Sequence, residues 1–497
     1  MKIALIISII TLASRLLSLI SVQVYMTFFG PRASAIEAYT FALTVPNIVF
    51  NLFGTSITAI VVPIYASLLK SDEKEADIFI KRMFAIIIAI VSFLMLIGFF
   101  LAPLVISITS LYYTQFAIFA LRVMLISMLF YGINYLFQGV LHSHNKFLLA
   151  AMVTVPSSLF IIGYTLILGD TFGVHGLVYA TVAGLSLQGL ILAPKAFKLL
   201  YKKGVRTKIN IKNIKENEHM KKAITMLGPL LISASSFQIM SLFNTTVATH
   251  FTIAAIQGHV MNLVLVASLT IIYSITSVYL PKLSVQWEED KERYKKTLNQ
   301  IIILVLMLMI PASVALFMLR NEIISLLMEW GNFSAEYAAL TATLLGIFGL
   351  AVVPVGLKEV ADRAYYSQKN SKIPSIFGFI IMTTSVLFTI FMRDTLGAYT
   401  VAVAYVTSFT VGSIGLLKSL KLFNVSFFIN LAKIMFSAGL MGIVLHIVPT
   451  LYFETGIIFI NRFLMLAVPG ILGVLTYLLM IYIFYRKKKS EFIMRGD

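Results

Sequence analysis

The chain has 497 residues, of which 59% are hydrophobic and 12% are charged, and this composition excludes a soluble globular protein. It has no cysteine, which excludes disulfides and thiolate metal sites. A formal net charge of +18 would favour a nucleic-acid partner in a soluble chain, but here the basic residues gather in alternate loops between apolar runs, so we expect no nucleic-acid binding.

Apolar runs of about 20 residues recur along the whole chain, and this length spans a bilayer. Runs this long and continuous are typical of helices rather than of barrel strands. We therefore expect an all-α polytopic membrane protein with about 14 transmembrane helices. The first run lacks the small-residue cleavage pattern of a signal peptide, so we expect it to be retained as a helix.

The first two spans, at about 3–28 and 36–69, carry ordered polar stripes. The stripe in the second span runs at steps of three and four residues, which places its side chains on one helix face. Such a face suits a helix that lines a wet cavity or packs on another helix through polar contacts. Its members include Glu37, Thr40, Thr44, Asn47 and Asn51.

Three charged residues lie inside or near the ends of these apolar spans. Arg15 is near the middle of the first span, where it either binds an anion in a cavity or reaches back to the cytoplasmic interface. Glu37, near the outer end of the second span, either pairs with Arg15 or Arg32 or lies in outer water. Arg122 in the fourth span is a gate residue, a structural ion pair, a cation that reaches the interface, or a substrate contact.

The longest polar stretch is a basic segment at 201–221, which is typical of a linker between two helical bundles. We predict an N-terminal lobe at 1–200 with helices 1 to 6 and a C-terminal lobe at 222–420 with helices 7 to 12. Helices 13 and 14 and a basic tail fill 421–497. The linker and the alternate loops that share its side of the membrane are basic. The positive-inside rule therefore places the linker and both termini in the cytoplasm.

An internal repeat indicates that the two halves are related. Ser56-Ile57-Thr58 is followed by Pro63 and then by an acidic and basic run, and Ser274-Ile275-Thr276 is followed in the same way by Pro281. The matching loop charges indicate that the halves run in parallel sense. Duplicated halves around a site at the membrane midplane are typical of alternating-access transporters.

The second half has its own polar residues within apolar spans. Asn244 lies on a polar face of the seventh span, while His259 and Asn262 lie one turn apart on the eighth. Helix–helix hydrogen bonding and cavity lining both fit these three side chains. The tenth span ends in a charged group that forms a cytoplasmic salt-bridge cluster or a gate. Its members are Lys358, Glu359, Asp362 and Arg363.

Motifs for catalysis and for metal binding are missing from the sequence. There is no Walker A glycine loop and no HExxH spacing. His142 and His144 share one helix end, but two imidazoles do not make a metal site. We therefore expect neither an enzyme nor a protein with a bound metal or cofactor.

Several short stretches together resemble the MurJ (MviN) family of lipid II flippases, in the multidrug/oligosaccharidyl-lipid/polysaccharide exporter superfamily. Their order and spacing, more than any single piece, make the resemblance specific, and it covers nearly the whole chain. The stretches include Ser14-Arg15-Leu16-Leu17, Glu37-Ala38-Tyr39, Leu280-Pro281-Lys282-Leu283-Ser284, Glu329-Trp330-Gly331-Asn332-Phe333 and Arg363-Ala364-Tyr365-Tyr366.

The resemblance implies two six-helix lobes around a central cavity, with two extra helices that border a groove for a lipid tail. It implies a flippase that turns undecaprenyl-diphosphate-linked peptidoglycan precursor (lipid II) across the bacterial cytoplasmic membrane, with this lipid-linked glycan and membrane lipid as partners. Partner proteins of cell-wall synthesis stay unknown. Arg15 would meet the diphosphate. The other candidate substrate-binding residues are Glu37, Thr40, Thr44, Asn47, Asn51, Asn244 and Asn262.

This chain departs from the family pattern at several cavity positions. Ser21 and Val22 stand where an Arg-Asp pair is usual, Phe50 and Asn262 stand where arginine is usual, and Asn244 replaces an aspartate linked to a sodium site in some relatives. Two alternatives therefore stay open: a flippase for another polyprenyl-linked glycan, and a cation-coupled drug antiporter. The antiporter would need a net acidic cavity, which Arg15 disfavours.

Overall fold

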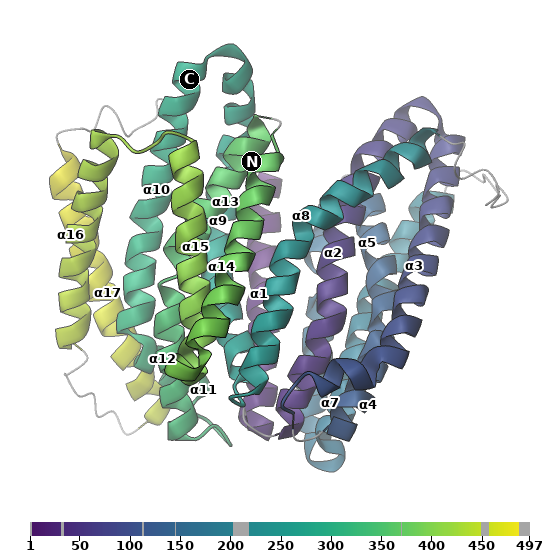
Figure 1. Cartoon of the computed structure of the whole chain (residues 1–497), viewed down its shortest axis with the longest axis horizontal. Helices are drawn as coiled ribbons and strands as arrows, with labels where there is room; N and C mark the ends of the chain where they lie inside the picture. The colour runs from purple at the N-terminus through teal and green to yellow at the C-terminus, as the bar shows by residue number, and fades with distance from the viewer. Residues whose placement is uncertain are drawn as a thin grey trace. The chain divides into compact units, whose positions relative to one another are not determined.

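The structure, a computed structural model, describes residues 2–30, 34–111, 114–144, 146–201, 218–368, 370–448 and 457–486. Within these ranges the secondary structure is helical, without strands, as the sequence predicted. The chain forms two compact units, Met1–His259 and Val260–Asp497. Figure 1 shows long helices running side by side within each unit.

The first unit is built from α1 to α8 and the start of α9. Most of the basic linker predicted at 201–221 lies outside the described residues, which resume at the start of α8. Within the unit, α2 packs against α4, α5 and α8, and α7 packs against α1 and α5. The helices are α1 Lys2–Phe29, α2 Ser34–Ser71, α3 Glu73–Ser107, α4 Thr114–Leu125, α5 Ser127–Ser143, α6 Phe147–Ala151, α7 Val155–Tyr201, α8 Glu218–Thr249 and α9 Ala254–Glu289.

The second unit contains the rest of α9 and the remaining helices. Its pairs include α14 with α15, α10 with α13 and α16, and α16 with α17. The helices are α10 Lys291–Met318, α11 Arg320–Met328, α12 Ala335–Gly349, α13 Val352–Ser367, α14 Lys372–Leu396, η1 Gly397–Tyr399, α15 Thr400–Ser419, α16 Val425–Ile447 and α17 Ile458–Tyr485.

Several helices are long and apolar enough to cross a bilayer. The part of the chain that the structure describes contains 8 such segments. They confirm a multi-pass membrane protein, whereas the count of about 14 helices stays a prediction. The segments are Glu73–Ser107, Thr114–Ser143, Leu148–Leu200, Lys291–Met318, Ala335–Ser367, Lys372–Ser419, Val425–Ile447 and Ile458–Tyr485.

The long element α7 consists of two helices joined at Gly173. This glycine has φ 56° and ψ −152°, a backbone conformation that side chains with a Cβ rarely adopt. The hydroxyl of Tyr164 donates a hydrogen bond to its carbonyl over 2.6 Å, which satisfies a group that the break removes from the helix ladder. The junction lies between two apolar runs of the sequence, at about 147–169 and 174–200, which we predict to be separate spans.

The predicted repeat has one local structure in both copies. Asp72 follows α2 and caps α3, and its Oδ1 accepts hydrogen bonds from the amides of Lys74 and Glu75 over 2.9 and 3.2 Å. Asp290, 218 residues later, caps α10 in the same way. The side chains of Pro63 and Pro281 are outside the described set, and the relation between the two halves stays a prediction.

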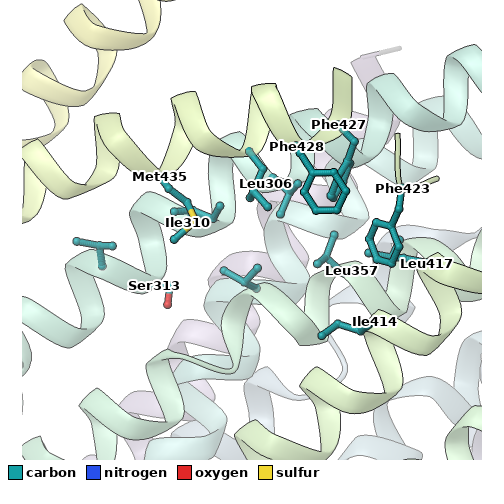
Figure 2. A pocket seen from close by; sticks show the side chains of 13 residues that line it. Leu306, Ile310, Ser313, Leu357, Ile414, Leu417, Phe423, Phe427, Phe428 and Met435 are labelled. Atoms are coloured by element: carbon teal, nitrogen blue, oxygen red, sulfur yellow. The ribbon is translucent and has the colours of Figure 1, made fainter. Parts of the chain in front are cut away.

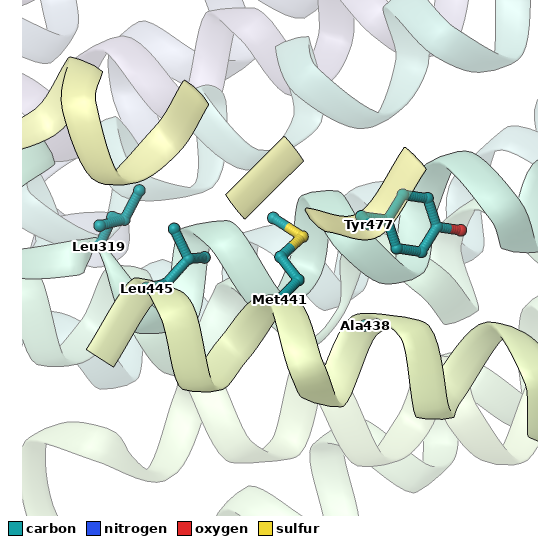
Figure 3. Packing of buried hydrophobic residues seen from close by; sticks show 5 residues of the cluster. All are labelled: Leu319, Ala438, Met441, Leu445 and Tyr477. Atoms are coloured by element: carbon teal, nitrogen blue, oxygen red, sulfur yellow. The ribbon is translucent and has the colours of Figure 1, made fainter. Parts of the chain in front are cut away.

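The last two helices close the second unit through a buried apolar cluster. Its core comprises Leu319, Ala438, Met441, Leu445 and Tyr477, contributed by the end of α10, by α16 and by α17. Figure 3 shows Met441 and Leu445 one turn apart on α16, with the ring of Tyr477 beside them. Burying this apolar surface fixes α16 and α17 to α10.

Candidate functional site

The polar stripe of α2 has three different environments in the first unit. Thr44 donates its hydroxyl to the carbonyl of Thr40 over 2.9 Å, within the helix. Asn47 accepts a hydrogen bond from the hydroxyl of Tyr131 on α5 over 3.1 Å. Asn51 is exposed. One stripe thus both packs against a neighbouring helix and presents a polar side chain to the surroundings.

Glu37, at the start of this stripe, is only 1% exposed. Its two carboxylate oxygens accept hydrogen bonds from the amides of Ala254 and Ala255 over 2.9 and 3.1 Å. These amides open α9, where unpaired N–H groups and the helix dipole favour a negative charge. Glu37 therefore ties α2 to the first turn of α9. Arg32, one of its predicted partners, lies outside the described residues.

Several buried polar atoms on α2, α8 and the start of α9 lack a hydrogen-bond partner among the described residues. They are Thr40 Oγ1, Asn244 Oδ1, Gln257 Oε1 and both ring nitrogens of His259. Asn244 and His259 are 4% and 2% exposed. Because buried polar groups normally bond to protein, water or a ligand, these atoms have unused hydrogen-bonding capacity inside the first unit. The sequence singled out Thr40, Asn244 and His259, but not Gln257.

Arg15 is half-buried on α1. The preceding residue, Ser14, is buried and donates its hydroxyl to the carbonyls of Ile10 and Ala151 over 2.8 and 3.1 Å. This contact attaches α1 to the end of α6 at the level of Arg15. Asn262, also predicted to bind substrate, is exposed on α9 and belongs to the second unit.

The charged group on α13 contains an ion pair. Lys358 Nζ lies 2.7 Å from Asp362 Oδ2 and 3.8 Å from Glu359 Oε1. Asp362 is buried, so the positive partner offsets the cost of placing its charge away from water. Arg363 follows directly, half-buried on the same helix. The gate role of this group stays a prediction.

Arg122 has a backbone partner rather than a carboxylate. Its Nε donates to the carbonyl of Phe99 over 3.2 Å, and its guanidinium carbon lies 4.7 Å from the centre of the Phe99 ring. No acidic side chain among the residues described here forms an ion pair with it. In a regular helix the carbonyl of Phe99 would accept a hydrogen bond from the N–H of residue 103. That residue is Pro103, which has no N–H.

The second unit contains an apolar groove of about 580 Å³ formed by α10, α13, α15, α16 and the loop before α16. Figure 2 shows three phenylalanines at one end, with Ile310, Met435 and the hydroxyl of Ser313 toward the other. Residue composition alone did not locate this groove. Its lining residues are Leu306, Ile310, Ser313, Val314, Val353, Leu357, Ile414, Leu417, Phe423, Phe427, Phe428, Leu431 and Met435.

Long apolar helices, polar helix faces and an apolar groove define a polytopic membrane protein. The sequence family described as lipid II flippase MurJ matches residues 26–479. The chain therefore belongs to the lipid II flippase MurJ family, which confirms the predicted resemblance.

Individual relatives agree with this assignment. A probable lipid II flippase MurJ from Aquifex aeolicus is 27% identical over 393 residues, covering 76% of this chain and 74% of the relative. One from Rickettsia prowazekii is 23% identical and covers 90% of both chains.

Solved structures share the fold. A lipid II flippase MurJ in an inward closed conformation has a TM-score of 0.83 at 23% identity, with 97% of this chain and 99% of that chain covered. An inward-facing multidrug resistance MATE family transporter of the MOP superfamily has a TM-score of 0.67 at 16% identity, with 86% and 99% covered. These similarities confirm the predicted all-α fold.

Proposed function

We propose that this chain moves lipid II across the bacterial cytoplasmic membrane by alternating access. The observation that carries the proposal is the presence, in one member of this family, of a 580 Å³ apolar groove and of helix faces with buried polar atoms. A lipid-linked glycan needs both, because its tail is stable in an apolar channel while its charged, sugar-bearing head must stay hydrated or hydrogen-bonded.

The groove in the second unit suits the lipid tail. Of its 13 lining residues, only Ser313 carries a side-chain hydroxyl, and that hydroxyl is already donated to the carbonyl of Gly349 over 2.9 Å. A polar head would therefore find no unused donor there, whereas an apolar chain would bury its surface against leucine, isoleucine and phenylalanine.

The polar residues of α1, α2, α8 and α9 suit the head group. Arg15 would contact the diphosphate, because a guanidinium forms strong charge-assisted hydrogen bonds with phosphate oxygens. Neutral hydrogen bonds would come from Thr40, Thr44, Asn47, Asn51, Asn244 and Asn262. Glu37 would act mainly by holding the start of α9, since both of its oxygens already accept hydrogen bonds there.

The orientation and class follow from the same proposal. Both termini would lie in the cytoplasm, and the chain would act as a transporter rather than an enzyme. Arg122 and the charged group on α13 would support conformational change through contacts between or within helices. Neither would touch the diphosphate.

A second candidate function is transport of another polyprenyl-diphosphate glycan. The feature that favours it is the set of neutral residues, Ser21, Val22 and Phe50, at positions where the resemblance described above implies charged residues. Fewer cations around the diphosphate would place more of the recognition on the sugar.

The test is rescue of a bacterial strain depleted of its own lipid II flippase, with membrane levels of this chain measured in parallel. We expect growth to be restored. Failure to rescue at normal membrane levels would reject lipid II as substrate. Purified protein in vesicles that contain lipid II or another undecaprenyl-diphosphate glycan would then separate the two candidates, by the accessibility of each head group from outside.

A further inference from the structure

Pro311 interrupts the backbone hydrogen bonds of α10. In a regular α-helix the carbonyl of Met307 would accept the N–H of residue 311, but proline has no N–H and its ring crowds that carbonyl. A carbonyl without a donor inside a membrane-spanning helix is costly, because lipid offers no replacement. The site therefore requires a donor from another part of the protein.

Tyr477 on α17 supplies that donor. Its hydroxyl donates to the carbonyl of Met307 over 2.7 Å. The side chain is 6% exposed and belongs to the apolar cluster shown in Figure 3. A buried phenol therefore replaces the backbone donor that the sequence of α10 lacks.

The same stretch of α10 forms one wall of the apolar groove. Leu306 and Ile310, which flank Met307 and Pro311, both line the groove. Ile310 and Val314 line the groove and also pack against the cluster that contains Tyr477. Any change in the path of α10 at Pro311 is therefore transmitted directly to the groove wall.

We propose that Tyr477 is a positioning residue for this wall: by replacing the donor that Pro311 removes, its hydroxyl fixes the path of α10 and thus the width of the apolar groove. The consequence for lipid transport rests on the proposed function, whereas the structural role of the hydroxyl does not.

The first unit has an independent example of the same arrangement. In α3, Pro103 frees the carbonyl of Phe99, and the Arg122 side chain on α4 donates to it over 3.2 Å. Two prolines within membrane-spanning helices thus each have a polar side chain from a neighbouring helix on the freed carbonyl. The contact at Pro103 shows that a side chain from a neighbouring helix can take the place of a backbone donor that proline lacks.

The structural role is tested with spin labels across the groove. Leu306→Cys and Met435→Cys place labels on α10 and α16 in a chain that has no other cysteine. In detergent or vesicles, Tyr477→Phe should shift and broaden the distance distribution between them. Tyr482→Phe, on the same helix but 55% exposed, is the matched control and should leave it unchanged.

Rescue by a second substitution separates the hydroxyl's role from general packing. Pro311→Ala restores a backbone N–H at position 311, so Met307 no longer needs the phenol. We therefore expect Tyr477→Phe to have little effect in the Pro311→Ala background. If Tyr477→Phe leaves the distances unchanged in the wild-type background, or changes them equally in both backgrounds, the positioning role is wrong.

A transport assay tests the functional consequence of the Tyr477 hydrogen bond. Tyr477→Phe should lower flipping of an undecaprenyl-linked lipid by about tenfold, the size expected from one unsatisfied buried carbonyl, and a short-tailed analogue should be much less affected. An equal loss for both tails would contradict a role in the groove. If the wild-type chain flips neither lipid, the proposed function fails, while the spin-label distances still decide the role of Tyr477.

Discussion

The carboxylate of Glu37 accepts a hydrogen bond from the amide of Ala254, 217 residues further along the chain, over 2.9 Å. A second bond, from the amide of Ala255, makes the carboxylate a cap for the first two amides of α9. The turn before this helix is itself constrained: Thr252 has φ 54°, which is unusual for a β-branched residue. On the other side of the turn, the hydroxyl of Ser110 forms a hydrogen bond with Nδ1 of His250. The backbone amide of Ser110 donates to the hydroxyl of Thr249. Glu37 thus holds a strained turn in place.

Replacing Glu37 should destabilise the protein. We expect Glu37→Ala to lower the free energy of unfolding by about 2 kcal/mol, because two buried amides lose a charged acceptor. Glu37→Gln keeps one acceptor and should lose about half as much. Thermal unfolding of the purified protein measures both, with the exposed Glu289→Gln as control. Equal stability of Glu37→Ala and the wild type would show that the Glu37 cap does not stabilise this turn.

The environment of the α2 stripe predicts a gradient of solvent access. Single cysteines at Asn51, Asn47 and Phe41 should react with a small aqueous thiol reagent in that order, fastest first. Asn51 is exposed, Asn47 is half-buried against Tyr131, and Phe41 is 0% exposed. The measured quantity is the labelling rate in membranes. Equal rates at all three positions would mean that the stripe does not face an aqueous space.

The sequence predicts the helical fold well because helices depend on local signals. Span length, the glycine at position 173 and the aspartates before α3 and α10 act within one or two turns. Long-range contacts give no such signal. The interval of four residues between Met307 and Pro311 reveals a carbonyl without a donor, but not that Tyr477 provides one. Likewise, the stripe of α2 identifies Glu37 without identifying α9 as its partner, because that contact depends on how the helices pack.

The proposed orientation predicts the sidedness of two loops. Arg393→Cys, an exposed position at the end of α14, should react with an impermeant thiol reagent added to intact cells. Lys208→Cys in the basic linker should react only after the membrane is opened. Mass tagging of each variant measures the modified fraction. Outside labelling at position 208 but not at 393 would reverse the proposed topology.

The ion pair on α13 should show strong coupling. Lys358→Met leaves Asp362 buried without its cation and should cost about 3 kcal/mol of stability, whereas Lys358→Met combined with Asp362→Leu should cost less than either of these two changes alone. The exposed pair Lys295 and Glu292, 3.4 Å apart, is the control and should show almost no coupling. A double-mutant cycle of unfolding free energies measures both pairs. Additive effects at Lys358 and Asp362 would show that the pair contributes nothing beyond its separate side chains.

Arg15 carries the proposed contact with the diphosphate. If it binds phosphate oxygens, Arg15→Ala should lower substrate affinity about ten- to hundredfold, since a charged hydrogen bond is worth roughly 1.5–3 kcal/mol. Arg15→Lys keeps the charge but loses the two-pronged geometry, so it should retain partial activity. Rescue of a flippase-depleted strain measures transport, with membrane levels checked for each variant. Full activity of a normally inserted Arg15→Ala protein would support the other interpretation, in which the side chain reaches back to the interface, because removing that charge costs the transport cycle nothing.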